Sequence, residues 1–280
     1  MTIEIGTPPI PFDAGRLGPL ADQFRTGQPF PHVTIPGFLT LSPDQLAPSF
    51  PHPEWPGWTR FRDTYQHQKM FCNDLALIPA PLATIIQQLS APAFLKALET
   101  LTRIPALIPD PYLEGGGLHS SGPGGILAPH TDFHHYRRLA LHRRINLLLY
   151  LNPEWSEDDG GCLELYEAGR MVPVVTIVPT WGTCVVFETD DRSVHGFSRP
   201  IRPGRWRHSI ALYYYTSAET SGFSGDTSTH WRSHAPASGL GRLRLPLYKT
   251  LIFGSKCLSR LAHGVNPHMG SRPLSARDDR

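Results

Sequence analysis

The spacing of hydrophobic residues predicts helices in the first part of this 280-residue chain. Over 80–103, apolar side chains recur every three or four residues, which is typical of a helix with one buried face. Pro92 predicts a break of this region into two helices. Closer to the N-terminus, the spacing predicts a short amphipathic helix over 14–27 and a strand over 31–39 that runs into a loop. The proline-rich residues 1–14 predict an extended arm.

Beyond residue 110 the pattern changes to short β-rich runs separated by glycine, proline and aspartate. These runs are GGILAPHTDF, RRINLLLYLN, GCLELYE, VPVVTIV, GTCVVFE and HSIALYYYT. Short, fairly regularly spaced strands favour a sandwich or a barrel. We therefore predict three regions: an N-terminal arm with helical support over 1–110, a β core over 111–216, and a linker over 217–280 that holds a helix around Pro246–His263.

Composition narrows the class of partner. The formal charge of +2 and the pI near 8.4 are too modest to indicate a concentrated basic face, which a protein needs to bind nucleic acids or membrane surfaces. The N-terminus lacks the basic start and apolar run of a signal peptide, and no apolar stretch is long enough to span a membrane. We expect a cytoplasmic protein with no nucleic-acid partner and no membrane span. Its oligomeric state stays open.

The cysteines do not indicate a redox or zinc site. They lie far apart without any CxxC pair, which argues against a zinc knuckle or a dense disulfide framework. Two of them alternate with apolar positions in predicted strands, so we expect buried, unreactive thiols at Cys162 and Cys184.

His130 and Asp132 are the strongest candidates for chemistry. They stand two apart on a predicted strand, so both side chains point to the same face and can contact one metal ion. A distant histidine would complete a facial triad of two histidines and one carboxylate, which leaves three coordination positions open on iron(II). His195 fits this role, because it lies where a strand should end near the metal and Gly196 beside it allows close approach of the backbone.

Arg207 adds a second type of site to this pattern. It lies at the head of an apolar strand, and a guanidinium pairs with a carboxylate through two charge-assisted hydrogen bonds. Ser209, two residues on, faces the same side and offers a hydroxyl donor. This strand therefore predicts a binding site for a dicarboxylate tail close to the metal.

The motifs HTD, HGF and RHS, in this order, resemble the Fe(II)/2-oxoglutarate-dependent oxygenase family, especially its prolyl 4-hydroxylase-like branch. Between the ligands, RRINLLLYLNPEW and GGCLELY are also similar to that branch, and PFPHVTIPGFL is a weaker match near the N-terminus. The resemblance implies a mainly β (α+β) fold, with a double-stranded β-helix (jelly-roll) core and flanking N-terminal helices. It implies Fe(II) held by His130, Asp132 and His195, 2-oxoglutarate as co-substrate, and ascorbate as an accessory reductant.

The same resemblance implies a set of co-substrate contacts. Arg207 and Ser209 would bind the distal carboxylate of 2-oxoglutarate, and Tyr150 and Asn146 would make further contacts to it. The chain departs from the family upstream of the first ligand. Several prolyl hydroxylases carry a tyrosine where this chain has His119 and Ser120.

The implied reaction is hydroxylation of a C–H bond, with oxidative decarboxylation of 2-oxoglutarate to succinate and carbon dioxide. Asp132 favours hydroxylation over halogenation, because related halogenases lack the carboxylate. The substrate class stays open between amino acids, peptides or proteins, and small metabolites. Two alternatives share the scaffold: a cupin-type metal enzyme, which needs no Arg-x-Ser motif, and a non-catalytic 2-oxoglutarate-binding protein, which would keep all of these residues.

Three other groups of residues favour a structural interpretation. The run over 133–138 is expected to form a solvated loop at the pocket mouth, with recognition of an acidic substrate as the alternative. Within it, the spacing of His134 from His130 makes it a poor competing ligand. We expect Trp181, Phe187 and the tyrosines over 213–215 in the core. The basic residues over 242–260 are expected on a solvated helix face, with a binding patch as the alternative.

Overall fold

The computed structural model describes residues 17–61, 65–217 and 229–232, together with five single positions between 250 and 261. The chain divides into two compact units, Met1–His234 and Ala235–Arg280, and the first contains all the elements named below. The arm predicted over 1–14 lies outside the described residues. The helix predicted around Pro246–His263 also lies outside them, except at the five single positions, which are helical.

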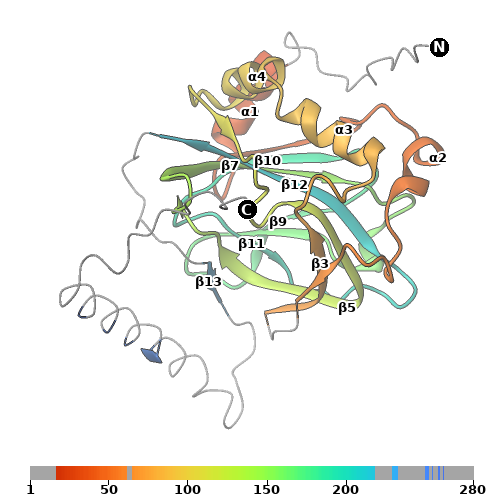
Figure 1. Cartoon of the computed structure of the whole chain (residues 1–280). Helices are drawn as coiled ribbons and strands as arrows, with labels where there is room; N and C mark the ends of the chain where they lie inside the picture. Colours follow the sequence, from red (N-terminus) through yellow and green to blue (C-terminus); the bar gives the residue numbers. More distant parts are fainter. Residues whose placement is uncertain are drawn as a thin grey trace, which may run out of the picture. The chain divides into compact units, whose positions relative to one another are not determined.

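Three helices lie together on one side of the strands: α1 (Leu17–Thr26), α3 (Ala80–Leu89) and α4 (Pro92–Thr102) (Figure 1). The predicted break at Pro92 is confirmed, because this proline begins α4, where its missing N–H leaves no hydrogen bond unmade. The apolar faces of α3 and α4 join the same core as Leu147 and Leu212 from the sheet. A short helix α2 (Pro43–Leu46), followed by a 3-10 turn (Ala47–Ser49), was not predicted. No helix among the described residues is long and apolar enough to cross a membrane.

The strands confirm the predicted mainly β jelly roll. In spatial order, the antiparallel path runs β1 (His32–Ile35), β10 (Cys184–Glu188), β7 (Leu141–Tyr150), β12 (Arg207–Thr216), β5 (Gly117–Thr131), β11 (Val194–Phe197), β8 (Leu163–Tyr166) and β9 (Pro173–Ile177). Each predicted β-rich run overlaps one of these strands. The unpredicted strands are β2 (Thr59–Arg60), β3 (Gln66–Cys72), β4 (Ile108–Pro109), β6 (His135–Tyr136) and β13 (His230–Trp231).

The long strand β5 links the two halves of the jelly roll and positions the site. Its first half pairs with β12 and its second half with β11, and β3 pairs with parts of both halves. A glycine-rich stretch over 122–125 separates the halves, and Gly124 has a φ of +75°, a conformation that favours glycine. The strand can therefore change direction at this point, and its C-terminal end lies beside β11 (Figure 1).

Candidate active site

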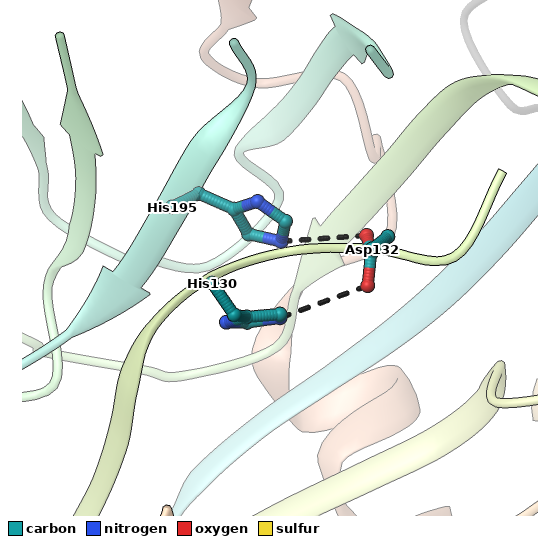
Figure 2. A group of neighbouring side chains, drawn as sticks. All are labelled: His130, Asp132 and His195. Atoms are coloured by element: carbon teal, nitrogen blue, oxygen red, sulfur yellow. Dashed lines mark ion pairs between the residues drawn. The ribbon is translucent and has the colours of Figure 1, made fainter. Parts of the chain in front are cut away.

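Three side chains converge at the end of β5, as the sequence predicted (Figure 2). His195 on β11 is paired directly with His130 on β5, and the two rings lie side by side with centroids 4.4 Å apart. Asp132 follows β5 and turns its carboxylate toward both rings. Its Oδ1 lies 3.6 Å from Nε2 of His130, and its Oδ2 lies 3.6 Å from Nε2 of His195. All three residues are buried.

The geometry of these residues fits a metal ion. One ligand atom from each residue lies within 4.8 Å of the others. Nδ1 of His130 lies 2.9 Å from the carbonyl oxygen of Ala128, and Nδ1 of His195 lies 3.0 Å from that of Ser193. Because a carbonyl only accepts, each Nδ1 carries the proton and each Nε2 presents a lone pair to the centre. Two imidazoles and one carboxylate in this arrangement are the ligand set that non-haem iron(II) prefers.

No second group of three such ligands occurs among the described residues. His134, considered above as a competing ligand, is not part of the group. Its Nδ1 lies 3.2 Å from Oδ1 of Asp191 instead.

The electrostatics hold the ligands in the protonation states that a metal requires. Burial lowers the pKa of His130 to about 3 and also lowers the pKa of His195, so both imidazoles stay neutral. Burial by itself raises the pKa of Asp132. The neighbouring Arg143 guanidinium, together with the hydrogen bond from Asn146, outweighs this effect and holds the pKa of Asp132 below its usual range. The carboxylate is therefore ionised.

Two side chains of β7 orient Asp132. Nη2 of Arg143 donates a hydrogen bond to Oδ2 of Asp132 at 2.9 Å, and Nδ2 of Asn146 donates to the same oxygen at 2.8 Å. Nε of Arg143 also donates to Oδ1 of Asn146 at 2.8 Å, and the guanidinium lies 3.4 Å from the centre of the Tyr213 ring. Since Oδ2 accepts both bonds, Oδ1 is the oxygen left for a metal.

The sequence interpretation missed Arg143. It also assigned Asn146 to the co-substrate, and that contact stays a prediction, because the amide of Asn146 binds Asp132 and Arg143 here. A signal was present in the sequence, since Arg143 and Asn146 are polar positions at the start of an otherwise apolar run.

A cavity of about 170 Å³ opens beside the triad, and three neighbouring strands supply one wall. Pairing of β3 with β5 and of β5 with β12 forms two cross-strand rows, one of Lys69, Ser121 and Arg207 and one of Phe71, His119 and Ser209. All six residues line the cavity. Of the two residues considered for the position of the tyrosine in several prolyl hydroxylases, His119 lines the cavity and Ser120 does not.

Arg207 is held in the cavity wall by two hydrogen bonds. Its Nε donates to the carbonyl oxygen of Gly161 at 2.7 Å, and its Nη2 donates to the Tyr150 hydroxyl at 3.2 Å. Tyr150 is fully buried, and burial raises its pKa to about 12, so the phenol stays protonated. The remaining guanidinium donors are available to a carboxylate in the cavity. The co-substrate contacts predicted for Arg207, Ser209 and Tyr150 stay predictions.

One expectation about the aromatic residues was wrong in part. The run over 133–138 is a solvated loop only in part, because Arg137 and Arg138 are exposed, whereas β6 pairs with β7 and His134 and Tyr136 are buried. Tyr213 is buried in the core as expected, and its ring also lines the cavity under Arg143. The other expected core residues are buried or pack against the core, namely Trp181, Phe187, Tyr214 and Tyr215, and the thiols Cys162 and Cys184 are buried and unpaired.

The fold and the site define a non-haem iron oxygenase of the jelly-roll class, and comparison with known proteins supplies the family. Residues 116–215 match the family model described as the 2OG-Fe(II) oxygenase superfamily. The prolyl 3-hydroxylase OGFOD1 of Xenopus laevis is 39% identical over 77 residues, which cover 26% of this chain and 15% of that protein. The prolyl 3,4-dihydroxylase OGFOD1 of Ostreococcus tauri is 35% identical over 83 residues, which cover 26% of this chain and 16% of that protein. The aligned segments are thus a small part of these relatives.

Solved structures agree on the fold. A prolyl 4-hydroxylase from Phytophthora capsici has a TM-score of 0.50 at 20% identity and covers 78% of this chain and 68% of its own. The non-haem α-ketoglutarate-dependent epimerase SnoN has a TM-score of 0.50 at 15% identity, covering 81% of this chain and 97% of its own. At such identities the likeness concerns the fold alone.

The segment over 116–215, which contains the three ligands, thus matches the 2OG-Fe(II) oxygenase superfamily. His130, Asp132 and His195 are its iron(II) ligands, and the family implies 2-oxoglutarate as co-substrate. The cupin-type alternative is therefore not retained.

Proposed function

We propose that this oxygenase hydroxylates a prolyl residue in a peptide or protein substrate. The observation that carries the proposal is the similarity to the two OGFOD1 proteins, which are named as prolyl hydroxylases. The intact metal triad supports a catalytic rather than a purely binding role.

The balanced reaction converts one substrate C–H bond, 2-oxoglutarate and dioxygen into the alcohol, succinate and carbon dioxide. When bound, iron(II) would activate dioxygen for oxidation of that C–H bond, with 2-oxoglutarate as the second electron donor. Arg207 and Ser209 hold the distal carboxylate of 2-oxoglutarate through charged and hydroxyl hydrogen bonds. The cavity lining supports a dianionic co-substrate, because it includes three permanent cations, Lys69, Arg143 and Arg207, and one carboxylate, Asp132.

The remaining cavity wall suits a small apolar ring. Phe133, Tyr213 and Trp231 line the cavity beside the ligands. Aromatic faces pack well against apolar groups and keep water away from them. The pyrrolidine ring of a prolyl residue would pack on this wall with its C–H bonds toward the triad.

Matched peptides test the proposal. Each peptide of a panel is paired with a copy in which alanine replaces the central proline, and free proline and small metabolites are further substrates. Succinate release above the substrate-free rate, and gain of one oxygen atom measured by mass spectrometry, report hydroxylation. His130→Ala serves as the inactive control.

The expected result is turnover of proline peptides and none of their alanine partners. Turnover of free amino acids or metabolites alone would refute a prolyl peptide substrate while leaving the oxygenase assignment in place. Binding of 2-oxoglutarate without succinate release from any substrate would favour the non-catalytic alternative.

A further inference from the structure

The short strand β13 lies directly against the metal-ligand end of β5. His230 is paired with Thr131 and Trp231 with His130, and the backbone N–H of Arg232 donates to the carbonyl oxygen of Pro129 at 2.7 Å. Strand β3 pairs with β5 only as far as Leu127. Residues 230–232, which follow the last strand of the jelly roll in the sequence, therefore cover the edge of β5 beside the iron ligand His130.

Trp231 places its ring on His130. The two ring centroids are 4.6 Å apart with an interplanar angle of 28°, and Trp231 also stacks with Tyr65 at 5.5 Å and 21°. On the far side of the ligand pair, the Phe187 ring meets His195 edge-on at 4.8 Å. The two imidazoles, themselves 4.4 Å apart, are thus each in contact with one aromatic ring, His130 with Trp231 and His195 with Phe187.

We propose that Trp231 is a positioning residue for the iron site. The hydrogen bond from Nδ1 of His130 to the Ala128 carbonyl sets the tautomer and one direction of the ring. It leaves the ring plane free to tilt about that bond. Stacking of the indole restricts this tilt, so Nε2 already faces the centre before the metal binds, and less ordering is required on binding. Trp231 acts on iron affinity whatever the substrate is.

The expected effect is moderate. Residues that support a metal-binding histidine are worth about 10–100-fold in metal affinity. Trp231 orients the ring without hydrogen-bonding to it, so we expect the lower end of this range, about tenfold.

Metal titration of the full-length protein tests the proposal without turnover. Anaerobic isothermal titration with iron(II), and with nickel(II) as a redox-inert probe, is carried out without 2-oxoglutarate or substrate. The variants are Trp231→Ala, Trp231→Leu and Trp231→Phe. His230→Ala is the control, because it removes an exposed side chain from the same strand. Thermal unfolding of each metal-free variant shows whether it is folded.

The proposal predicts that Trp231→Ala binds both metals about tenfold more weakly than wild type. The metal affinity of Trp231→Phe should stay within about threefold of wild type, and that of His230→Ala should be unchanged. Trp231→Leu fills apolar space without a ring, and it replaces the alanine variant if that variant does not fold. Wild-type affinity in the alanine or leucine variant would overturn the proposal. An equal loss in His230→Ala would also overturn it, because strand pairing and not the indole would then hold the ligand.

Discussion

Replacing Arg207 by lysine probes the co-substrate site with the least disturbance of the iron site. The substitution keeps a positive charge at the cavity wall but exchanges a planar fork of donors for a compact ammonium. Arg207 gives one N–H to Gly161 and one to Tyr150, which leaves its other donors for bidentate pairing with the distal carboxylate of 2-oxoglutarate. Lysine cannot make that pairing.

The size of the effect follows from the lost hydrogen bonding. A hydrogen bond to a charged group is worth about 1.5–3 kcal/mol. At about 1.4 kcal/mol per decade, 2-oxoglutarate should bind Arg207→Lys roughly ten- to hundredfold more weakly. Iron affinity should be nearly unchanged, because Arg207 is not among the ligands.

The assay is an anaerobic titration of 2-oxoglutarate into the iron(II)-loaded protein, followed through the visible charge-transfer band expected for the chelate. The control ligand is 2-oxopentanoate, in which a methyl group replaces the distal carboxylate. Wild type and Arg207→Lys should bind it equally, because the carboxylate that Arg207 would recognise is missing. Equal weakening of both ligands would refute the reasoning, and so would an unmoved 2-oxoglutarate titration.

Three further substitutions test the site and its surroundings. Asp132→Ala should abolish hydroxylation but leave weak binding of iron(II) and 2-oxoglutarate, since two imidazoles and a chelating keto acid still offer donors; near-normal turnover would mean that another carboxylate serves the metal. Arg143→Leu leaves the buried Asp132 charge without its cation, so urea denaturation of the metal-free protein should show a loss of about 3–5 kcal/mol in the free energy of unfolding; a loss below about 1 kcal/mol would contradict a strong pair. Burial lowers the pKa of His208 to about 4 from an ordinary 6.5. As the pH falls, His208 takes up a proton in the unfolded chain before it does so in the folded protein. The stabilisation from the neutral ring is therefore complete above pH 6.5, and the free energy of unfolding falls by about 3 kcal/mol toward about pH 4. His208→Phe should remove that part of the pH dependence, and an unchanged slope would show that His208 does not cause it.

The spacing of residues along the sequence was sufficient to predict two helices and to bring two of the three iron ligands together. Helical spacing over 80–103 and the proline within it predicted α3 and α4, because a proline at the first helical position lacks only a hydrogen bond that is not made there. The two-residue period of a strand was enough to place His130 and Asp132 together. The order of the HTD, HGF and RHS motifs then indicated the family, which the match over 116–215 bears out.

The orientation of Asp132 depends on a β-bulge in β7, which the two-residue alternation of a strand does not predict. Arg143 and Asn146 are three apart, so strict alternation would place them on opposite faces of β7. In the structure, Tyr214 pairs with Ile145 and Tyr215 with Arg143, so Arg144 is an extra residue in the ladder. This bulge brings Arg143 and Asn146 to one face, where both bind Asp132.

Tertiary structure alone decided which distant segments complete the site. Lys69 reaches the cavity because β3 pairs with β5, and Trp231 reaches His130 because β13 pairs with the end of the same strand. Neither short segment has an apolar alternation that would identify it as a strand. Such pairings between remote parts of the chain are set by the backbone hydrogen bonds that the edge of β5 leaves unmade, and the spacing of residues along the chain does not record them.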